Sequence, residues 1–344
     1  MTSKEWLKSE LEVLDCCPIC ESLDSKKIYE GLEDKAFFCA PGKWNLYKCE
    51  KCNSIYLNPR PNKKSIVKAY SKYFTHDDIK DFNSLQFKEK IRILFSNGYR
   101  NWSYGTNDKP SNFLGVVIGL LWKNGQRIID ASMRNLPKPN KGSRLLDVGC
   151  GSSQFLSRAK SMGWDVTGID FDLMAVKAAR KQGIDVRHGG IEILDPNKDK
   201  FDFITMAHVI EHVHNPVDTL KKCYKLLRDN GKIWIDTPNI ESSGLTIFGK
   251  SWLGLDCPRH LVLFSNNSLD YILKQTGFTN IQNEPYRPVC DTFFRQSMAI
   301  NESKDPFSEL IKKYELKEIV KNSEKMAFKH IKKREFITVS AEKF

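Results

Sequence analysis

The sequence predicts an α/β fold in which a mostly parallel β-sheet is preceded by a small cysteine-rich module and a helical connecting segment. From about residue 141, short apolar runs such as "RLLDV" and "WDVTGID" alternate with stretches of helical periodicity. Before residue 60, two Cys-x-x-Cys pairs lie in a segment too short to fold on an apolar core of its own. The expected boundaries are residues 14–60 for the module, 61–140 for the basic, largely helical connecting segment and 141–344 for the sheet domain.

The composition is that of an ordinary globular protein. The 344 residues are 40% hydrophobic and 28% charged, which argues against extended disorder. Most of the formal net charge of +12 lies in the connecting segment, because residues 61–144 hold sixteen basic and six acidic side chains, whereas residues 15–60 hold seven of each. A basic segment favours an anionic partner, either a small molecule or a nucleic acid.

The longest apolar run, Phe113–Trp122, has 10 residues, about half of the roughly 20 that cross a bilayer as a helix. No membrane span is therefore expected. We interpret the run as a buried or lid-forming helix, with contact at a membrane interface as the alternative. The stretch "MTSKEWLKSELEVLD" lacks the apolar core of an export signal, so a cytoplasmic location with reduced cysteines is expected.

The two cysteine pairs predict a structural zinc site. Cys17 and Cys20 form one pair, Cys49 and Cys52 the other, with 28 residues between them. Two such pairs supply four thiolates to a tetrahedral zinc ion and leave no open position for water. The module is therefore expected to be a zinc ribbon that depends on its metal. Cys16 and Cys39 fall outside the spacing and are expected to be bystanders.

The run "LLDVGCG" at residues 145–151 predicts a tight turn between a buried strand and a helix. A dinucleotide site would have a third glycine in "GCGSSQF", and the acidic Asp147 before the turn would repel a pyrophosphate. An acid suits a cation instead, such as the amino group of a methionine moiety. Asp170 ends the next strand, 23 residues after Asp147, where a carboxylate reaches both hydroxyls of a ribose lying over the first turn.

These residues resemble the class I S-adenosylmethionine-dependent methyltransferases, whose first motif is a D-x-G-x-G turn. The resemblance covers roughly residues 141–343 and implies a Rossmann-like sheet of seven strands with an antiparallel last strand. It extends to a third strand in "IDVRHGG", a fourth in "FDFITMAHVIEHV", and a fifth in "GKIWIDTPN" after a turn at Asn230 and Gly231. The segments "SNNSLDYILKQTGFTNI" and "REFITVSAEK" resemble the end of that fold.

The resemblance also implies a set of cofactor residues. Asp147, Gly149, Cys150 and Gly151 would hold the methionine portion, Asp170 the ribose, and Phe171 the adenine. Many relatives have an aspartate after the third strand, and Gly190 stands at that place here. Adenine recognition is therefore expected from Ile191 and Glu192.

The run "HVIEHVHNP" places His208, Glu211 and His212 on one face if it opens a helix. Three roles compete for these side chains: structural hydrogen bonding, general base catalysis with His208 as the first candidate, and metal binding. The last follows from a resemblance to the E-x-x-E-H cluster of ubiquinone-biosynthesis O-methyltransferases.

A second cluster in "SWLGLDCPRHLVLF" holds Trp252, Asp256, Arg259 and His260. It indicates either substrate contact, with His260 as the second candidate base, or a lid held by core packing of Trp252 and Phe264.

A zinc module ahead of such a domain resembles the arrangement in sugar methyltransferases of polysaccharide and antibiotic pathways. The expected function is methyl transfer to a small, glycosyl or anionic acceptor such as a nucleotide sugar. The alternative is an RNA methyltransferase that grips phosphates with the ribbon and the basic segment, although the ribbon itself is neutral. A third, non-enzymatic reading is a zinc-binding module on a degenerate scaffold.

Overall fold

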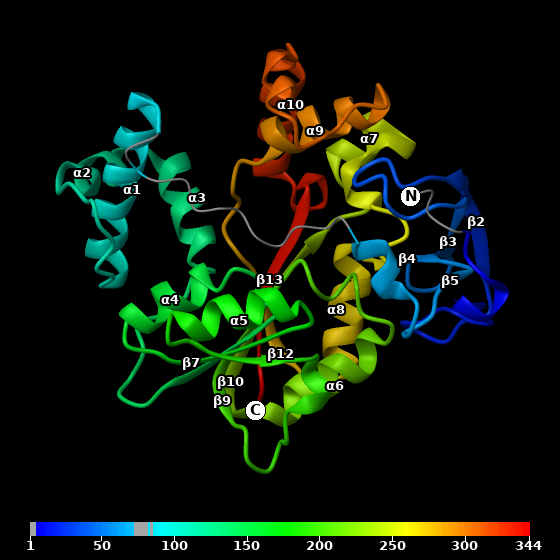
Figure 1. Ribbon diagram of the computed structural model, residues 1–344, viewed down its shortest axis with the longest axis horizontal. Coiled ribbons are helices and arrows are strands. Elements are labelled where there is room, and N and C mark those ends of the chain that lie inside the picture. Colours follow the sequence, from blue (N-terminus) through cyan, green and yellow to red (C-terminus); the bar gives the residue numbers. More distant parts are fainter. Residues whose placement is uncertain (1–4, 72–81, 83–84) are drawn as a thin grey trace. The chain divides into compact units, whose positions relative to one another are not determined.

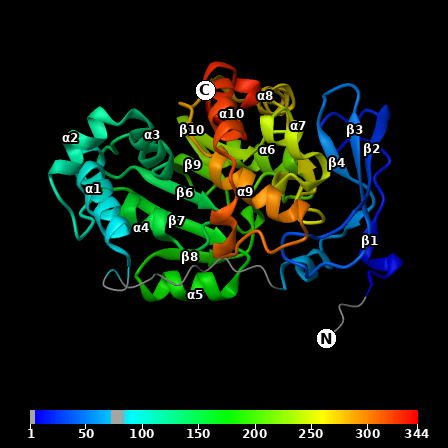
Figure 2. The same ribbon diagram turned by 90° about the horizontal axis from the view of Figure 1, so that it is seen from above.

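The computed structural model describes residues 5–71, 82 and 85–344 (Figures 1 and 2). By its contacts the chain divides into two compact units. Unit 1 comprises Met1–Phe74, Ala207–Tyr224 and Ile235–Phe344, and unit 2 comprises Thr75–Met206 and Lys225–Trp234. The boundaries expected from the sequence at residues 60 and 140 stay a prediction.

The main sheet has seven strands in the order β12-β13-β10-β9-β6-β7-β8. The pairs β6/β7, β6/β9 and β7/β8 are parallel, and β12 pairs antiparallel with β13. This confirms the expected fold. The strands are β6 (Arg144–Val148), β7 (Asp165–Asp170), β8 (Asp185–His188), β9 (Phe201–Ala207), β10 (Leu227–Pro238), β12 (Thr279–Asn283) and β13 (Phe336–Glu342).

The apolar runs of the sequence are buried in this sheet. In β6, Leu145 and Leu146 are fully buried, as expected for a strand covered on both faces. Gly168 in β7 has a structural role, since a Cβ there would lie 2.7 Å from Cys150 Sγ and from Leu156 Cδ1. Asn230, expected in a turn, lies within β10 in the left-handed region, at φ 63°.

Four helices lie next to strands of this sheet in the sequence: three follow a strand, and the last precedes β12. They are α4 (Gln154–Ser161), α5 (Leu173–Lys181), α6 (Pro216–Leu226) and α8 (Asn266–Gln275). Asp172 caps α5, because its Oδ1 accepts the backbone N–H of Met174 at 2.8 Å. On α4, Phe155, Leu156 and Ala159 are buried, which matches an apolar stripe of helical period.

The connecting segment is helical in unit 2, as expected. It contains α1 (Phe87–Tyr104), α2 (Leu114–Leu121) and α3 (Lys123–Ser132), and α2 contacts both of the others (Figures 1 and 2, cyan to green). Of the two interpretations of Phe113–Trp122, the buried helix is wrong, because only Gly115, Val116 and Gly119 are buried and the other side chains of the run are exposed. The lid-forming helix stays a prediction.

In unit 1 the N-terminal module forms a four-stranded sheet in the order β11-β4-β3-β2 (Figure 1, blue to yellow). Three strands belong to the module itself: β2 (Ser25–Leu32), β3 (Trp44–Cys49) and β4 (Ile55–Leu57). The fourth, β11 (Val262–Leu263), comes from far along the chain and pairs antiparallel with β4. Two further short strands, β1 (Leu11–Glu12) and β5 (Arg60–Pro61), pair antiparallel with each other. In the sequence, β1 precedes β2 and β5 follows β4.

Unit 1 also holds α7 (Ser243–Phe248), α9 (Cys290–Asn301) and α10 (Lys317–Lys329). These helices pack on a cluster of Cys290, Phe294 and Leu316. Short 3-10 helices in the described chain span Lys8–Glu10, Ile66–Tyr70, Ile191–Ile193, Gly249–Ser251, Leu253–Leu255, Glu309–Lys313 and Ile331–Lys333. Within the described residues, none of the helices is both long enough and apolar enough to cross a membrane.

Candidate functional site

The glycine turn after β6 is held by backbone hydrogen bonds to the neighbouring strand. The N–H groups of Gly149 and Cys150 both donate to the carbonyl oxygen of Ile169, at 2.8 and 3.2 Å. Gly149 and Gly151 have φ values of 69° and 50°, which glycine adopts at little cost. The Cys150 side chain packs toward Gly168, so this residue offers its backbone to the turn and not its thiol.

Asp170 lies directly beside this turn. Its Oδ2 accepts the N–H of Gly151 at 2.8 Å, and its Oδ1 accepts the N–H of Asp172 at 2.8 Å. Each carboxylate oxygen accepts more than one hydrogen bond, so both remain able to accept from a diol. The structure therefore brings the predicted ribose residue and the predicted turn together.

Asp147 is fully buried and meets a cation, but the cation belongs to the protein. Its Oδ1 accepts hydrogen bonds from the Arg134 guanidinium and from Thr205 Oγ1, the latter at 3.0 Å. Burial raises the pKa of the Asp147 carboxyl, while Arg134 opposes that shift. Oδ2 of Asp147 is buried without a hydrogen-bond partner.

Arg134 is the functional candidate that the sequence did not reveal. It follows α3 and stands in the left-handed region at φ 51°. Its guanidinium lies 3.9 Å from the centre of the Phe155 ring and donates to Thr205 Oγ1 at 2.7 Å. Arg134 lies in no recognisable motif. The only hint in the sequence is that this arginine stands shortly before Asp147, an acid in a predicted buried strand.

The residues expected at the adenine gather around Gly190. The Phe171 side chain is 73% exposed, and its ring would meet a Cβ built on Gly190 at 2.7 Å. The Glu192 carboxylate accepts the N–H of Gly190 at 2.9 Å, and Ile191 is buried. Glycine at 190 thus makes room for Phe171 and Glu192, where a larger residue would clash with both.

The four predicted cysteines come together in unit 1, with their sulfurs all within 4.8 Å of one another. Cys17 Sγ lies 3.6 Å from Cys52 Sγ, and Cys20 Sγ lies 3.5 Å from Cys49 Sγ. Tetrahedral zinc with Zn–S bonds of about 2.3 Å requires sulfurs roughly 3.8 Å apart, which fits this cluster.

The two cysteine loops have the same backbone form. The N–H of Cys17 donates to Ser22, and the N–H of Cys49 donates to Ser54, both at 2.9 Å. The residue after each second cysteine, Glu21 or Asn53, has φ near 60°. Cys39 lies outside the cluster, with its Sγ 3.3 Å from the Ala69 carbonyl. Among the described residues, Cys16 does not join it either.

The histidine run does not open a helix, because residues 208–215 form turns and α6 begins at Pro216. His208 has φ 54°, with its N–H donating to the Asp236 carbonyl at 2.8 Å. Its Nδ1 lies 3.5 Å from Glu211 Oε1, its Nε2 lies 3.4 Å from Asp236 Oδ2, and its side chain is 44% exposed. Burial lowers the pKa of His208, but the two carboxylates outweigh that effect and raise it.

His212 and His260 pack against each other, with ring centres 4.6 Å apart. Nδ1 of His212 lies 3.0 Å from the Arg259 carbonyl, and Nδ1 of His260 lies 2.8 Å from the Gly254 carbonyl. Burial and the neighbouring His260 lower the pKa of His212 to about 4, so this ring is neutral at pH 7. Burial raises the pKa of Glu211, but His208 and the other histidines lower it to about 2.

Glu211, His212 and His260 offer ligand atoms within 4.8 Å of one another. This is a different trio from the His208, Glu211 and His212 set expected from the sequence, since His260 takes the place of His208. A metal role for these residues stays a prediction.

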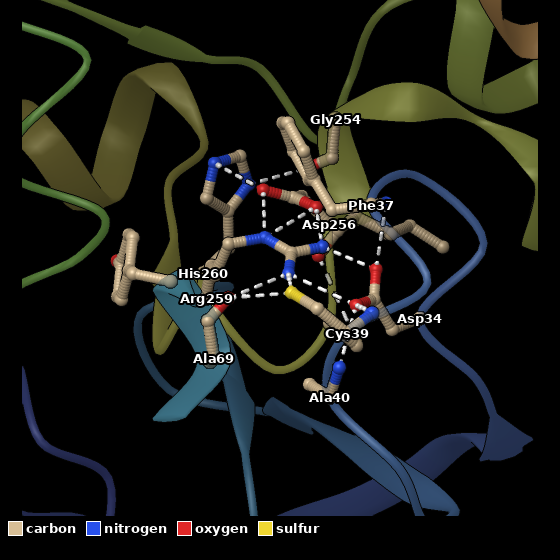
Figure 3. A network of polar contacts seen from close by, with 12 residues as sticks. Asp34, Phe37, Cys39, Ala40, Ala69, Gly254, Asp256, Arg259 and His260 are labelled. Carbon is tan, nitrogen blue, oxygen red and sulfur yellow. Dashed lines mark hydrogen bonds and ion pairs between the residues drawn. The ribbon is translucent and has the colours of Figure 1, made fainter. Parts of the chain in front are cut away.

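Arg259 ties the second predicted cluster to the N-terminal module (Figure 3). Its buried guanidinium donates to Asp34 Oδ2 at 3.1 Å, to Asp256 Oδ1 at 2.6 Å and to the Ala69 carbonyl at 3.0 Å. Trp252 and Phe264 are also buried. These contacts favour the packed lid over substrate contact for Arg259 and Trp252.

Comparisons with known proteins find methyltransferases that are similar to this chain. Residues 121–283 match the family model described as "Methyltransferase domain". The chain is similar to a tRNA U34 carboxymethyltransferase of Geobacter sp. (strain M21), with 30% identity over 217 residues that cover 60% of this chain and 63% of that protein. It is similar to a ubiquinone biosynthesis O-methyltransferase of Roseobacter denitrificans, with 29% identity over 162 residues, 44% of this chain and 65% of that protein. The chain thus spans just under two thirds of the length of each of these relatives.

Two solved structures align with this chain at lower identity. A SAM-dependent methyltransferase from Archaeoglobus fulgidus is 19% identical and aligns over 67% of this chain and 100% of its own, with a TM-score of 0.44. A phosphoethanolamine N-methyltransferase 2 from Haemonchus contortus, in complex with S-adenosyl-L-methionine, is 17% identical over 72% of this chain and 60% of its own, with a TM-score of 0.43.

Proposed function

We propose that this chain transfers a methyl group from S-adenosylmethionine to an oxygen of a small acceptor. The starting point is the match of residues 121–283 to the family model of a methyltransferase domain. The single observation that carries the proposal is the contact between Asp170 and the Gly151 N–H, which joins an acidic strand end to an open glycine turn. A carboxylate at the end of the second strand, beside a glycine turn after the first, is the arrangement that a ribose lying over that turn requires.

The residues of unit 2 fit this cofactor. Asp170 would accept the ribose hydroxyls, and Phe171 with Glu192 would border the adenine. The buried, unpartnered Oδ2 of Asp147 is an acceptor suited to an ammonium group. Arg134 neutralises the other oxygen of Asp147 and would attract a carboxylate. When bound, S-adenosylmethionine supplies a methyl group on a sulfonium, which makes the methyl an electrophile.

His208 is the residue that we propose as general base. Its ring is partly exposed, and Glu211 and Asp236 flank it on the two nitrogen sides. The flanking carboxylates raise the basicity of the imidazole and hold its orientation. His208 would accept the proton of a hydroxyl as its oxygen attacks the methyl group. His212 is a poorer candidate because its pKa is lowered to about 4, and His260 is buried.

The zinc ion that we propose for Cys17, Cys20, Cys49 and Cys52 is structural. Four thiolates complete a tetrahedral zinc site and leave no position for a substrate, and three of these cysteines, Cys17, Cys49 and Cys52, are buried. The ion would fix the two cysteine loops from which β2, β3 and β4 extend. Its contribution to the reaction is therefore indirect, through the shape of the module.

The acceptor class that we propose is a sugar, a nucleotide sugar or a polysaccharide precursor. Support comes from a cavity of about 210 Å³ in unit 1 whose lining includes Lys35, Lys43 and Lys250. The lining also holds Glu33 and Asp256, the latter paired with Arg259. The lysines still outnumber the carboxylates, and an excess of positive charge suits a phosphate-bearing ligand. The two relatives described above are named for other acceptors. We therefore base the glycosyl class on the cysteine module and on the basic charge of residues 61–144.

The test is a mass-spectrometric screen of purified protein with S-adenosylmethionine against nucleotide sugars, glycans and RNA. The expected result is the addition of one methyl group to a sugar substrate, abolished when His208 is replaced by Gln. Methylation of none of these classes by a protein that binds the cofactor would contradict the proposed acceptor. If the His208→Gln variant forms the same product at the wild-type rate, the proposed role of His208 as general base is contradicted.

RNA is the second candidate acceptor. The observation that favours it is the similarity to a protein named as a tRNA U34 carboxymethyltransferase, together with the basic residues 61–144. Binding of bulk tRNA that weakens steeply with salt would support this candidate, since phosphate contacts release counterions. Absence of binding at low salt would remove it.

A further inference from the structure

The helix α2 presents an outer face made entirely of large apolar side chains. In the sequence "FLGVVIGLLW", the exposed fractions of Phe113, Leu114, Leu121 and Trp122 are 75%, 57%, 80% and 56%. Val117, Ile118 and Leu120 are also exposed. Single exposed apolar residues are common on protein surfaces, but a continuous apolar patch marks a binding surface.

The inner face of the same helix is occupied by α1. A Cβ on Gly115 would lie 2.1 Å from the Phe95 carbonyl oxygen, and one on Gly119 would lie 2.4 Å from the Tyr99 ring. Gly98 of α1 meets the backbone of Asn112 in the same way. The glycines therefore let the two helices pack backbone to backbone. Because only glycine fits this contact, α2 cannot turn its leucines inward.

Basic residues stand at both ends of this apolar face. Lys109 and Lys123 are exposed, and residues 109–123 contain no acidic side chain. Trp122 and Phe113 lie at the two ends of the helix, where aromatic rings sit when a helix rests at a membrane surface. An apolar centre with lysines at its edges matches an anionic lipid surface in both apolarity and charge.

The length of the helix limits how it can bind. Eight residues span about 12 Å, which is too short to cross a bilayer but suits a helix lying at the boundary between headgroups and acyl chains. A free interfacial helix needs a polar face toward water. The helix α2 needs no polar face toward water, because α1 covers the face turned away from the lipid.

We propose that α2 is a membrane-docking element that inserts Leu114, Val117, Leu121 and Trp122 into the surface of an anionic bilayer. Docking would be weak and reversible, because few side chains insert, and it would weaken with salt, because lysines contribute. This inference goes beyond the proposed function and does not depend on it, since lipid binding is measured without a methyl donor.

The test is flotation of the full-length protein with two kinds of vesicle, pure phosphatidylcholine and phosphatidylcholine with about 30% phosphatidylglycerol. The wild-type protein is expected to float with the anionic vesicles at low salt and to be released at high salt. The variant Leu121→Glu should reduce the bound fraction about tenfold, because a carboxylate enters the apolar face. The matched control Leu310→Glu changes an equally apolar residue that is 63% exposed in unit 1 and should bind like the wild type.

Three results would overturn the proposal. The first is a wild-type protein that floats with neither vesicle at low salt, and the second is a Leu310→Glu variant that loses as much binding as Leu121→Glu. The third is a dimer in light scattering that Leu121→Glu dissociates while flotation is unchanged, which would assign the apolar face to a second copy of the chain.

Discussion

The glycine turn in unit 2 and the histidine cluster of His208, Glu211, His212 and His260 in unit 1 are built in different ways. The turn is held by backbone hydrogen bonds between residues close in sequence, and the Gly151 N–H and its acceptor Asp170 are 19 positions apart. The histidine cluster is held by side chains from distant segments. Tyr70 Oη contacts His212 Nδ1 across 142 positions, and Arg259 reaches Asp34 across 225.

The difference shows which region depends on the N-terminal module. Arg259 and β11 join the loop that carries His260 to the module, and Tyr70 reaches His212 directly. The hydrogen bonds described for the glycine turn go to Ile169 and Asp170, and none of them goes to a residue of the N-terminal module. Damage to the module should therefore disturb the histidine cluster and spare the cofactor turn.

The largest effect is expected from removal of the zinc ligands. In the double variant Cys49→Ser and Cys52→Ser, zinc content should fall to zero and methyl transfer should be lost, because the module loses the metal that holds it. Binding of S-adenosylmethionine, measured by calorimetry, should stay within about threefold of wild type. Equal loss of cofactor binding would contradict the separation of the two regions.

A smaller but still large effect is expected when the buried ion pair is broken. Arg259→Met leaves Asp34 and Asp256 buried without their cation, which should cost about 3–5 kcal/mol in the free energy of unfolding. The measurement is urea denaturation followed by tryptophan fluorescence. The control is Arg228→Met. The side chains of Arg228 and its partner Asp202 are 44% and 34% exposed, so loss of this ion pair should cost below about 1 kcal/mol.

The variant His208→Gln tests the histidine cluster without disturbing its supports. Loss of a positioned base should lower kcat by about a hundredfold to ten-thousandfold, with little change in the affinity for S-adenosylmethionine. The control is His330→Gln, an exposed histidine in a different segment, which should keep wild-type activity. If both variants retain full activity, His208 has a structural role only.

The smallest effect concerns the pH profile of activity. Glu211 and Asp236 raise the pKa of His208, because a nearby carboxylate stabilises the protonated ring. In wild type, kcat/KM should therefore rise with pH through a pKa above the ordinary histidine value. Glu211→Gln removes one carboxylate, so the rising limb should move to lower pH. A limb that stays in place would show that another group controls it.

The sequence was a good guide wherever function rests on local pattern. The turn at Gly149 and Gly151 and the gathering of four cysteines follow from short motifs and fixed spacing, and the seven-stranded sheet follows from the family resemblance that those motifs carry. The acid of Asp170 was likewise placed beside the turn by counting residues from Asp147.

What the sequence did not reveal depends on contacts between distant residues. Nothing near Arg134 marks it as the partner of Asp147, and β11 is two residues long, too short to leave a pattern. The sequence also left open whether His208 opens a helix; it does not, and its N–H donates to the Asp236 carbonyl instead. The run Phe113–Trp122 misled because two glycines and Val116, and not the leucines, make its buried face.

The central claim is that the turn after β6 and Asp170 at the end of β7 bind S-adenosylmethionine. The direct measurement is titration calorimetry of wild type, Asp170→Ala and Asp165→Ala, the last changing an exposed acid at the other end of the same strand. We expect that one cofactor binds per chain, that Asp170→Ala weakens binding at least about tenfold, and that Asp165→Ala binds like wild type. Absence of heat and of a thermal shift with wild type, or equal affinity in Asp170→Ala, would contradict it.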